Sequence, residues 1–131
     1  MKLLTKEIVN NMPALYETED LGNDAPIIVK FFTPWSNWTW YAKEASAIVV
    51  DDHDDDFRYH PLRNIQYDNI QKFLKGQKTR IADIVFFGLV DGFDKELGYF
   101  YMSELLSAKG PWGLRIERDM HFNGKTIKDV M

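Results

Sequence analysis

Glu117, Asp119 and His121 stand at alternate positions near the end of the chain, where two carboxylates and an imidazole could act together. On a β-strand, alternate side chains point to the same face at a spacing of about 6–7 Å. Such a set could hold a divalent metal ion. The same spacing is also typical of the solvated side of a half-buried strand, and by itself it is a weak motif. We favour the solvated strand. We therefore assign no metal, cofactor or catalytic residue, and keep Asp119 and His121 as candidate binding residues.

Arg118 lies between these residues but falls on the apolar side of the same alternation, with Leu114, Ile116, Met120 and Phe122. A buried guanidinium needs a partner, because an unpaired charge in a core costs several kcal/mol or more. Glu104 and Glu96 are the candidate partners. We favour an ion pair that ties the last strand to a short helix before it. The alternative is that Arg118 contacts an anionic ligand.

Aromatic side chains form the next group of candidates, because Phe, Tyr and Trp make up 15% of the residues. A small core does not have to hide all of them, so we expect an aromatic patch on the surface. Trp38 and Trp40 alternate on one face and are assigned to the core. The candidate binding residues are Trp35, Tyr41 and Trp112, and we expect Trp35 and Trp112 to be exposed because each lies in a turn.

The segment from about 46 to 79 is strongly polarised. It contains an acidic run with Asp51, Asp52, Asp54, Asp55 and Asp56, followed by a basic stretch that includes Lys72 and Lys75. The run lacks the Gly and the distal Glu of a calcium-binding loop, but it could mimic a phosphate backbone or be a solvated loop. The basic stretch could contact nucleic acid. We favour mutual neutralisation of the two parts, and we regard nucleic-acid binding as the weaker reading.

Several classes of function are disfavoured by composition. The chain has no cysteine, which excludes disulfides and thiolate nucleophiles, and its net charge of −4 gives no general attraction to nucleic acid or anionic membranes. We find no phosphate loop, dinucleotide glycine pattern or hydrolase elbow. No signal peptide or membrane span is expected, and we predict a cytoplasmic protein whose oligomeric state the sequence leaves open.

The pattern of apolar residues predicts an α+β fold. Strands are expected at 27–32, 38–41, 84–90, 97–101 and 114–122, with 84–90 in the centre because it is apolar on both faces. Short helices are expected at 5–12, 67–75 and 104–109, with a helical turn at 126–130. The 131 residues should form one domain, a small antiparallel sheet with short helices mainly on one face. We expect the 46–79 segment to be a charged, helical insertion outside this sheet.

Several segments of the sequence resemble a known protein family. The segments 29–34, 38–42, 86–90, 92–93, 96–100, 103–105, 110–114, 116–119 and 121–122 are similar to the bacterial domain-of-unknown-function family 2958. The resemblance implies a bacterial host and carriage on plasmids, conjugative elements or phages, and it implies no reaction, cofactor or catalytic residue. The family connects the corresponding strands by a shorter link, so the 46–79 insertion is atypical of it.

The sequence therefore favours a non-enzymatic protein of a bacterial mobile element that acts by binding another protein. Inhibition of a host defence nuclease is a specific form of this hypothesis. The alternative is a small enzyme, or a domain that binds a ligand or metal, using Glu117, Arg118, Asp119 and His121. It predicts a hollow beside the last strand.

Overall fold

The computed structural model describes residues 1–51 and 56–131. Within these residues a six-stranded antiparallel sheet has the order β5-β4-β2-β1-β6, with β3 also paired to β2. The strands are β1 (Val29–Phe32), β2 (Thr39–Val50), β3 (Phe57–Pro61), β4 (Ile81–Asp91), β5 (Lys95–Tyr101) and β6 (Glu117–Arg118). The helices are α1 (Lys6–Asn11), α2 (Tyr67–Leu74), α3 (Met102–Ser107) and α4 (Ile127–Val130), with short 3₁₀ turns η1 (Glu19–Asp24), η2 (Leu62–Asn64) and η3 (Pro111–Gly113). The predicted α+β class is confirmed.

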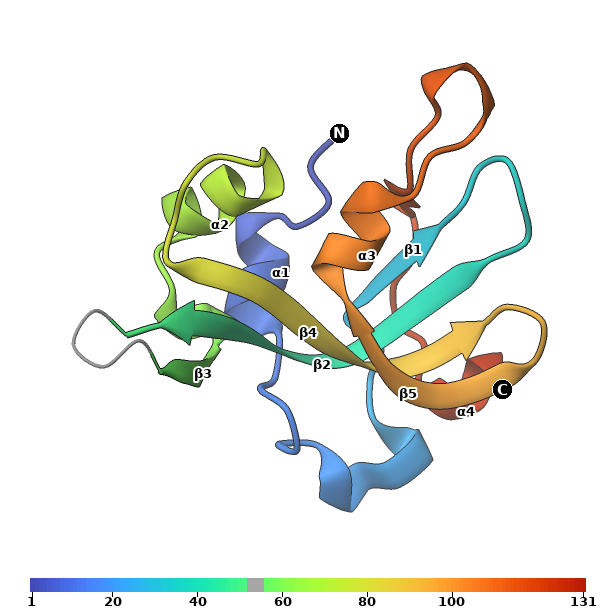
Figure 1. The fold of residues 1–131 in the computed structure, drawn as a ribbon. Helices are drawn as coiled ribbons and strands as arrows, with labels where there is room; N and C mark the ends of the chain where they lie inside the picture. Colours follow the sequence, from blue (N-terminus) through green and yellow to red (C-terminus); the bar gives the residue numbers. More distant parts are fainter. Residues whose placement is uncertain (52–55) are drawn as a thin grey trace.

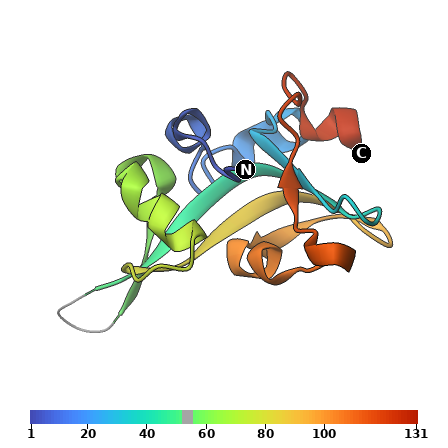
Figure 2. The ribbon, with the colours of Figure 1, turned by 90° about the horizontal axis from the view of Figure 1, so that it is seen from above.

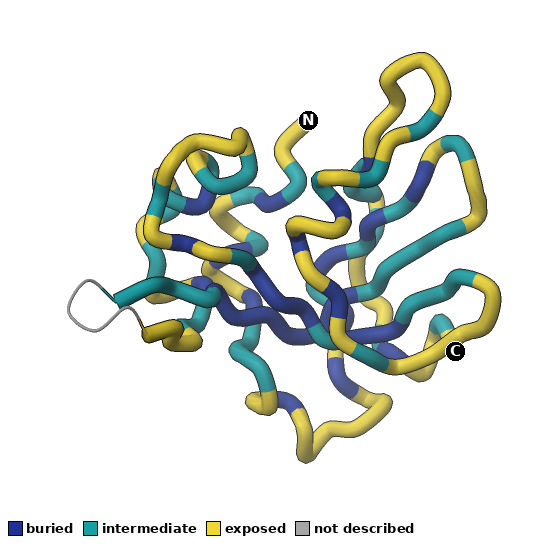
Figure 3. The backbone as a smooth tube through the Cα atoms, in the orientation of Figure 1, coloured by how far each residue is buried: buried dark blue, intermediate teal, exposed yellow. Residues whose placement is uncertain are grey.

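The two longest strands, β2 and β4, form the centre of the molecule. They pair from Thr39↔Asp91 to Val49↔Ile81, and Figure 2 shows them twisting diagonally across the view from above. Figure 3 shows that the buried parts of the backbone concentrate along this pair. Strand β4 lies between β2 and β5, so both of its edges are paired, and Ile84 on one face and Val85 on the other are buried, which confirms the central strand predicted at 84–90.

Alternating side chains of β4 divide the sheet into two faces. Ile84 and Phe86 point to the helical face, where they join a cluster with buried residues before and within α1, from α2 and from α3, including Leu4, Val9, Ile70 and Leu105. The opposite face, here called the open face, carries Leu89 in a smaller cluster with Ile27 and Ile127. In Figure 1, α1, α2 and α3 lie above the sheet, whereas η1 and α4 lie below it.

The helix ends follow from local chemistry in most cases. Thr5 caps α1 by accepting a hydrogen bond from the Ile8 N–H. Gly76, at φ 74°, ends the region of α2 in a left-handed conformation that favours glycine. Helix α3 begins at Met102, two residues before the predicted start, and the Glu104 carboxylate accepts a hydrogen bond from the Tyr101 N–H at its first turn. The Ser103 hydroxyl donates to Asp83.

The middle segment does not lie outside the sheet. Residues 46–50 continue β2, and β3 pairs with them from Ser46↔Pro61 to Val50↔Phe57. Leu62 and Ile70 are fully buried in the main cluster. The predicted helix at 67–75 is confirmed as α2, but the expectation of a separate add-on is wrong, since its apolar side completes the core.

The predicted long strand at 114–122 is mostly wrong. Only Glu117 and Arg118 pair with β1, opposite Phe32 and Phe31. The chain then turns, because the Asp119 carboxylate accepts a hydrogen bond from the His121 N–H two residues later. The Asp119 N–H still donates to the Lys30 carbonyl at 3.0 Å. Among the described residues, no helix is both long enough and apolar enough to cross a bilayer.

Candidate functional site

Four tyrosines are among the nine described residues that line a groove on the open face. We call it the tyrosine groove, and its lining residues are Ala14, Leu15, Tyr16, Ser46, Tyr59, Pro61, Val85, Tyr99 and Tyr101. Its volume is about 530 Å³, within the usual range for ligand pockets. Large aromatic side chains remain exposed here, with 65% of Tyr59 and 62% of Tyr16 accessible. Exposed aromatic area of this kind is typical of a binding surface.

Strand geometry accounts for the floor and one side of the groove. In β5, Phe100 points into the core and stacks on Phe86, so Tyr99 and Tyr101 must point to the open face. Tyr101 lies opposite Val85, and Tyr99 lies opposite Phe87 with ring centroids 4.9 Å apart. Cross-strand pairs of this type stabilise the sheet while leaving ring edges accessible.

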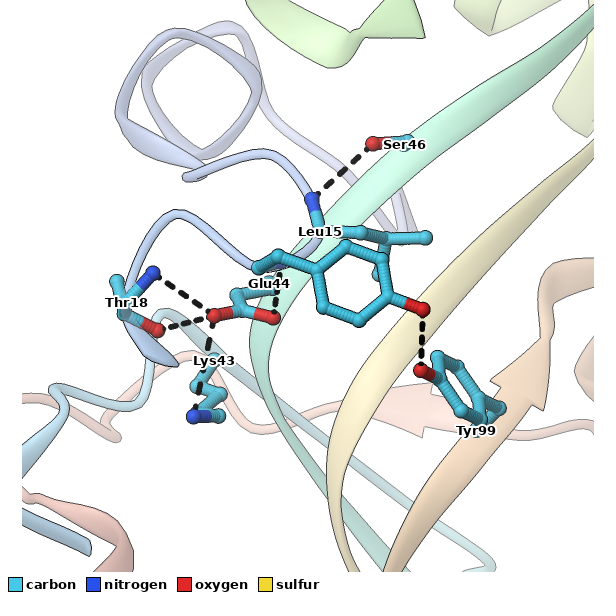
Figure 4. A network of polar contacts seen from close by, with 7 residues as sticks. Leu15, Thr18, Lys43, Glu44, Ser46 and Tyr99 are labelled. Carbon is cyan, nitrogen blue, oxygen red and sulfur yellow. Dashed lines mark hydrogen bonds and ion pairs between the residues drawn. The ribbon is translucent and has the colours of Figure 1, made fainter. Parts of the chain in front are cut away.

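The other side of the groove is formed by the chain between α1 and η1. This segment crosses the edge of β2 in the gap between β1 and β3, where the Pro13 carbonyl accepts a hydrogen bond from the Ala45 N–H at 2.9 Å. The Leu15 N–H then donates to the Ser46 hydroxyl at 3.2 Å. Figure 4 shows Leu15 and Ser46 joined in this way beside Glu44. The segment therefore supplies the strand contacts that β1 and β3 leave open.

Glu44 is the buried anchor of this segment, with only 2% of its surface exposed. Its Oε1 accepts from the Tyr16 N–H at 2.9 Å, and its Oε2 accepts from both the N–H and the hydroxyl of Thr18. The Lys43 ammonium lies 3.8 Å away (Figure 4). A buried carboxylate is tolerated only with such partners, because an unpaired charge would be expelled from the core. Glu44 thus fixes where the segment turns.

A β-bulge makes this arrangement possible. Ala42 pairs with Gly88 and Glu44 pairs with Phe87, so Lys43 is an additional residue in β2. The bulge places Lys43 and Glu44 together on the open face, where the Lys43 ammonium lies 5.4 Å from the Phe87 ring centroid.

Tyr16 is held in an unusual conformation at the rim of the groove. Its φ of 74° lies in the left-handed region, which non-glycine residues rarely adopt without support. The Glu44 hydrogen bond to its N–H and a 2.7 Å contact between the Tyr16 and Tyr99 hydroxyls provide that support. The hydrogen bond with Tyr16, followed by desolvation and the negative charges of Glu44 and Glu19, raises the pKa of Tyr99 to about 12.

The groove can bind by ring contacts and hydroxyl hydrogen bonds. Among the described residues that line the groove, the ionisable groups are phenols. In the part of the chain that the structure describes, no three His, Asp or Glu side chains are grouped as metal ligands, and this includes Glu117, Asp119 and His121. The arrangement therefore offers recognition chemistry, with no paired acid and base at the groove.

The predicted tryptophan candidates lie at the other end of the sheet. Trp112 is 96% exposed, as expected for a turn residue. Trp35 is only partly exposed, because its ring packs against Gly110, where an added Cβ would lie 2.3 Å from a ring atom. The expectation of an exposed Trp35 is therefore wrong: the residue fastens the loop of Gly110 to the β1–β2 turn. Trp38 does the same for Gly92, and Phe93 beside it is 94% exposed.

The other candidates near the chain's end have structural partners. Tyr41 packs on Phe122 with ring centroids 5.8 Å apart. Arg118 donates from Nε to the Lys2 carbonyl at 3.0 Å, and within the described chain no ion pair joins it to Glu104 or Glu96. Glu104 instead accepts from the Tyr101 N–H. The predicted pairing of Arg118 with either glutamate is therefore wrong.

Asp119 and His121 adjoin a second hollow, of about 350 Å³, that includes Arg118 and Asp119 among its lining residues. The N–H of His121, and then Lys30 at 3.2 Å, hold the pKa of Asp119 below its ordinary value. The side chain of His121 is exposed. The hollow beside the last strand that the ligand-binding hypothesis predicts is present.

The charged candidates of the middle segment are dispersed. Asp51 forms an ion pair with Arg58 at 3.1 Å, and its N–H donates to the Asp56 carbonyl. Lys72 and Lys75 are exposed on and just after α2. The predicted contacts at Asp52, Asp54 and Asp55 lie outside the described residues.

The principal residues of the groove were missed from sequence. The signal at Tyr99 and Tyr101 was available, since tyrosines flanking an apolar residue in a strand must share one face. Glu44 also carried a signal, because it is a carboxylate inside the otherwise mostly apolar stretch that forms β2. Tyr16 and Tyr59 offered none, since their position depends on how distant segments meet.

Comparison with known proteins gives one match to a family model, in the later part of the chain. Residues 72–128 match the model of a family described as a protein of unknown function, DUF2958, which confirms the resemblance over this range. The matched range contains α3, β4, β5 and β6, and therefore Tyr99 and Tyr101 of the groove. No curated protein and no solved structure matches the chain.

Proposed function

We propose that this chain is a non-enzymatic binding protein that recognises another protein through the tyrosine groove. The observation that carries the proposal is the set of exposed aromatic side chains on the open face, which includes Tyr16, Tyr59, Tyr99 and Tyr101. Tyrosine gives large contact area and a hydroxyl at little entropic cost, because its side chain has few rotatable bonds.

The groove is also well ordered for recognition. Three of its tyrosines project from paired strands, and the fourth is fixed by the Glu44 and Tyr99 hydrogen bonds. A preformed surface loses little conformational freedom when a partner binds, which favours affinity. Phe57, 64% exposed on the open-face side of β3, extends the aromatic surface beyond the groove.

In its specific form, the proposal makes the partner a bacterial defence nuclease and the chain a product of a mobile genetic element. The support is the family resemblance, which implies such carriage, together with the exposed aromatic surface. An inhibitor of this kind needs only to bind the nuclease and block its access to substrate. It needs no reacting group of its own.

The test is site-specific crosslinking in a bacterial host. A photoreactive residue at position 59 should trap one specific protein, and the trapped product should disappear in a Tyr99→Ser, Tyr101→Ser variant. Trp112→Ala, which alters a more exposed aromatic residue outside the groove, should leave capture unchanged. Absence of a trapped protein, or capture that ignores the Tyr99 and Tyr101 substitutions, would count decisively against the proposal.

A second candidate is ligand binding in the 350 Å³ hollow beside β6. Its support is the hollow itself, with a guanidinium and a carboxylate, Arg118 and Asp119, in its lining. A thermal-shift screen of small polar ligands together with metal analysis tests it. No shift in the melting temperature and no bound metal would remove its support.

A further inference from the structure

Negative charges exceed positive charges around the tyrosine groove. Arg63, two residues after Pro61 of the groove, pairs at 2.5 Å with Glu17, the residue after Tyr16, and this hydrogen bond lowers the pKa of Glu17. Lys43 pairs with Glu44, whose carboxylate also holds the Tyr16 N–H. Each of these two basic side chains therefore already has an acidic partner.

Carboxylates remain at both ends of the groove. At the Tyr101 end, Glu104 accepts from the Tyr101 N–H, and Asp83 lies two residues from Val85 on the same side of β4. At the Tyr99 end, Glu19 follows the segment that carries Tyr16. Within residues 1–51 and 56–131, no basic side chain forms an ion pair with Asp83, Glu104 or Glu19.

The raised pKa of Tyr99 also indicates negative electrostatic potential at the groove. Negative charge from Glu44 and Glu19 contributes to the raised pKa of Tyr99, which means that the position disfavours a further anion. Aromatic ring faces also carry negative partial charge and attract ammonium and guanidinium groups. The ring faces and the carboxylates without basic partners thus both favour a cationic group in the groove.

We propose that the tyrosine groove receives a lysine- or arginine-bearing segment of the partner protein, with the cationic side chain against the tyrosine rings. This inference rests on the proposed function and specifies the chemistry of its partner. An acidic segment would meet uncompensated carboxylates at both ends. A purely apolar segment would offer no hydrogen-bond partner to the Tyr59 and Tyr101 hydroxyls that it covers.

The test compares two short peptides that differ only in charge. One has arginine at its centre, and the other has citrulline, which has nearly the same shape but is neutral. In nuclear magnetic resonance titrations up to about 10 mM, where a millimolar interaction is already saturated, the arginine peptide should shift the amide signals of Tyr59, Tyr99 and Tyr101. The citrulline peptide should bind at least about fivefold more weakly.

Two matched double variants distinguish the contribution of the aromatic rings to peptide binding from that of apolar volume alone. Tyr59→Leu, Tyr101→Leu keeps apolar volume but removes the rings, and it should weaken the arginine peptide by about fivefold or more. Tyr59→Phe, Tyr101→Phe keeps the rings and should bind nearly as wild type. The residues are exposed on strands, and the dispersion of the amide spectrum verifies that each variant is folded.

Equal binding of both peptides, unchanged binding by the leucine variant, or no shift with either peptide would overturn this inference. None of these results would touch the crosslinking result, which tests whether a protein binds at all. A captured partner whose footprint contains no lysine or arginine would likewise overturn the cationic assignment and leave protein binding intact.

Discussion

Tyr16 shows how one residue can tie two distant parts of the chain into one surface. Its left-handed backbone directs its ring toward β5, and its hydroxyl meets that of Tyr99, which is 83 residues away in the chain. The backbone strain of such a residue, of the order of 1 kcal/mol, persists only when its surroundings hold it. Here the Glu44 carboxylate holds it through the Tyr16 N–H.

Removing the Tyr16 hydroxyl should lower the pKa of Tyr99. In Tyr16→Phe the strongest cause of the raised pKa is lost, so the step near pH 12 should move toward the ordinary value of about 10. Because the folded-state pKa is raised, the corresponding stability is fully present below about pH 10 and disappears as the pH rises toward 12. Tyrosinate absorbance during an alkaline titration measures the shift.

Tyr99→Phe provides the control for this measurement, because it removes the titrating group itself. The highest step should then be absent, not displaced. A Tyr16→Phe titration that overlays the wild-type curve would mean that the Tyr16–Tyr99 hydrogen bond does not form in solution.

At the scale of elements, strands with an uninterrupted apolar pattern could be predicted from the sequence, whereas strands whose alternation of apolar and polar residues is interrupted could not. The strand around Ile84–Val90 and its partner β5 were predicted because apolar side chains recur without a break. Strand β2 was predicted only to Tyr41, since the bulge at Lys43 shifts the alternation from Trp40 and Ala42 to Ala45 and Ala47. The alternation at 114–122 was misleading, because the turn at Asp119 ends strand pairing there.

The pairing of β2, β4 and β5 yields a sharp test with two glycines that face each other. Gly88 and Gly98 are direct partners, but an added Cβ would lie 1.8 Å from the Tyr41 carbonyl oxygen at Gly88 and would meet open space at Gly98. Gly88→Ala should therefore lower the free energy of unfolding by more than about 2 kcal/mol, by forcing β2 and β4 apart.

Gly98→Ala is the matched control and should change stability by less than about 1 kcal/mol, in the stabilising direction, because alanine loses less backbone entropy. Urea denaturation compares the two variants directly. Similar effects of both substitutions would contradict the close approach of Tyr41 to β4.

At the scale of the whole molecule, the segment from 46 to 79 belongs to the core. Sequence reasoning placed it outside the sheet because its charges are conspicuous, whereas the apolar side chains that determine its position, Leu62 and Ile70, are few. The tyrosine groove depends on the same segment, since Ser46, Tyr59 and Pro61 line it. Only the part of the groove that β4 and β5 supply, with Val85, Tyr99 and Tyr101, could have been anticipated from the sequence.

Ile70→Ala should therefore destabilise the whole fold and not just α2. Loss of a fully buried isoleucine costs about 2–5 kcal/mol, and a single cooperative transition at lower urea concentration is expected. Lys72→Ala, one half-turn away on the exposed side, should stay within about 0.5 kcal/mol of wild type. A variant in which α2 melts separately while the sheet persists would show that the segment is independent.

The additional residue at Lys43 has one more consequence, which concerns chain length. Side chains alternate along a strand, so deleting a single residue there would turn over everything from Ser46 to Val50. The serine hydroxyl would enter the hydrocarbon interior, and Ala47 on the open face would offer the Leu15 N–H no acceptor. Insertions and deletions at Lys43 should thus be far more damaging than substitutions. Related chains should keep the number of residues in this part of β2 even where the amino acids differ.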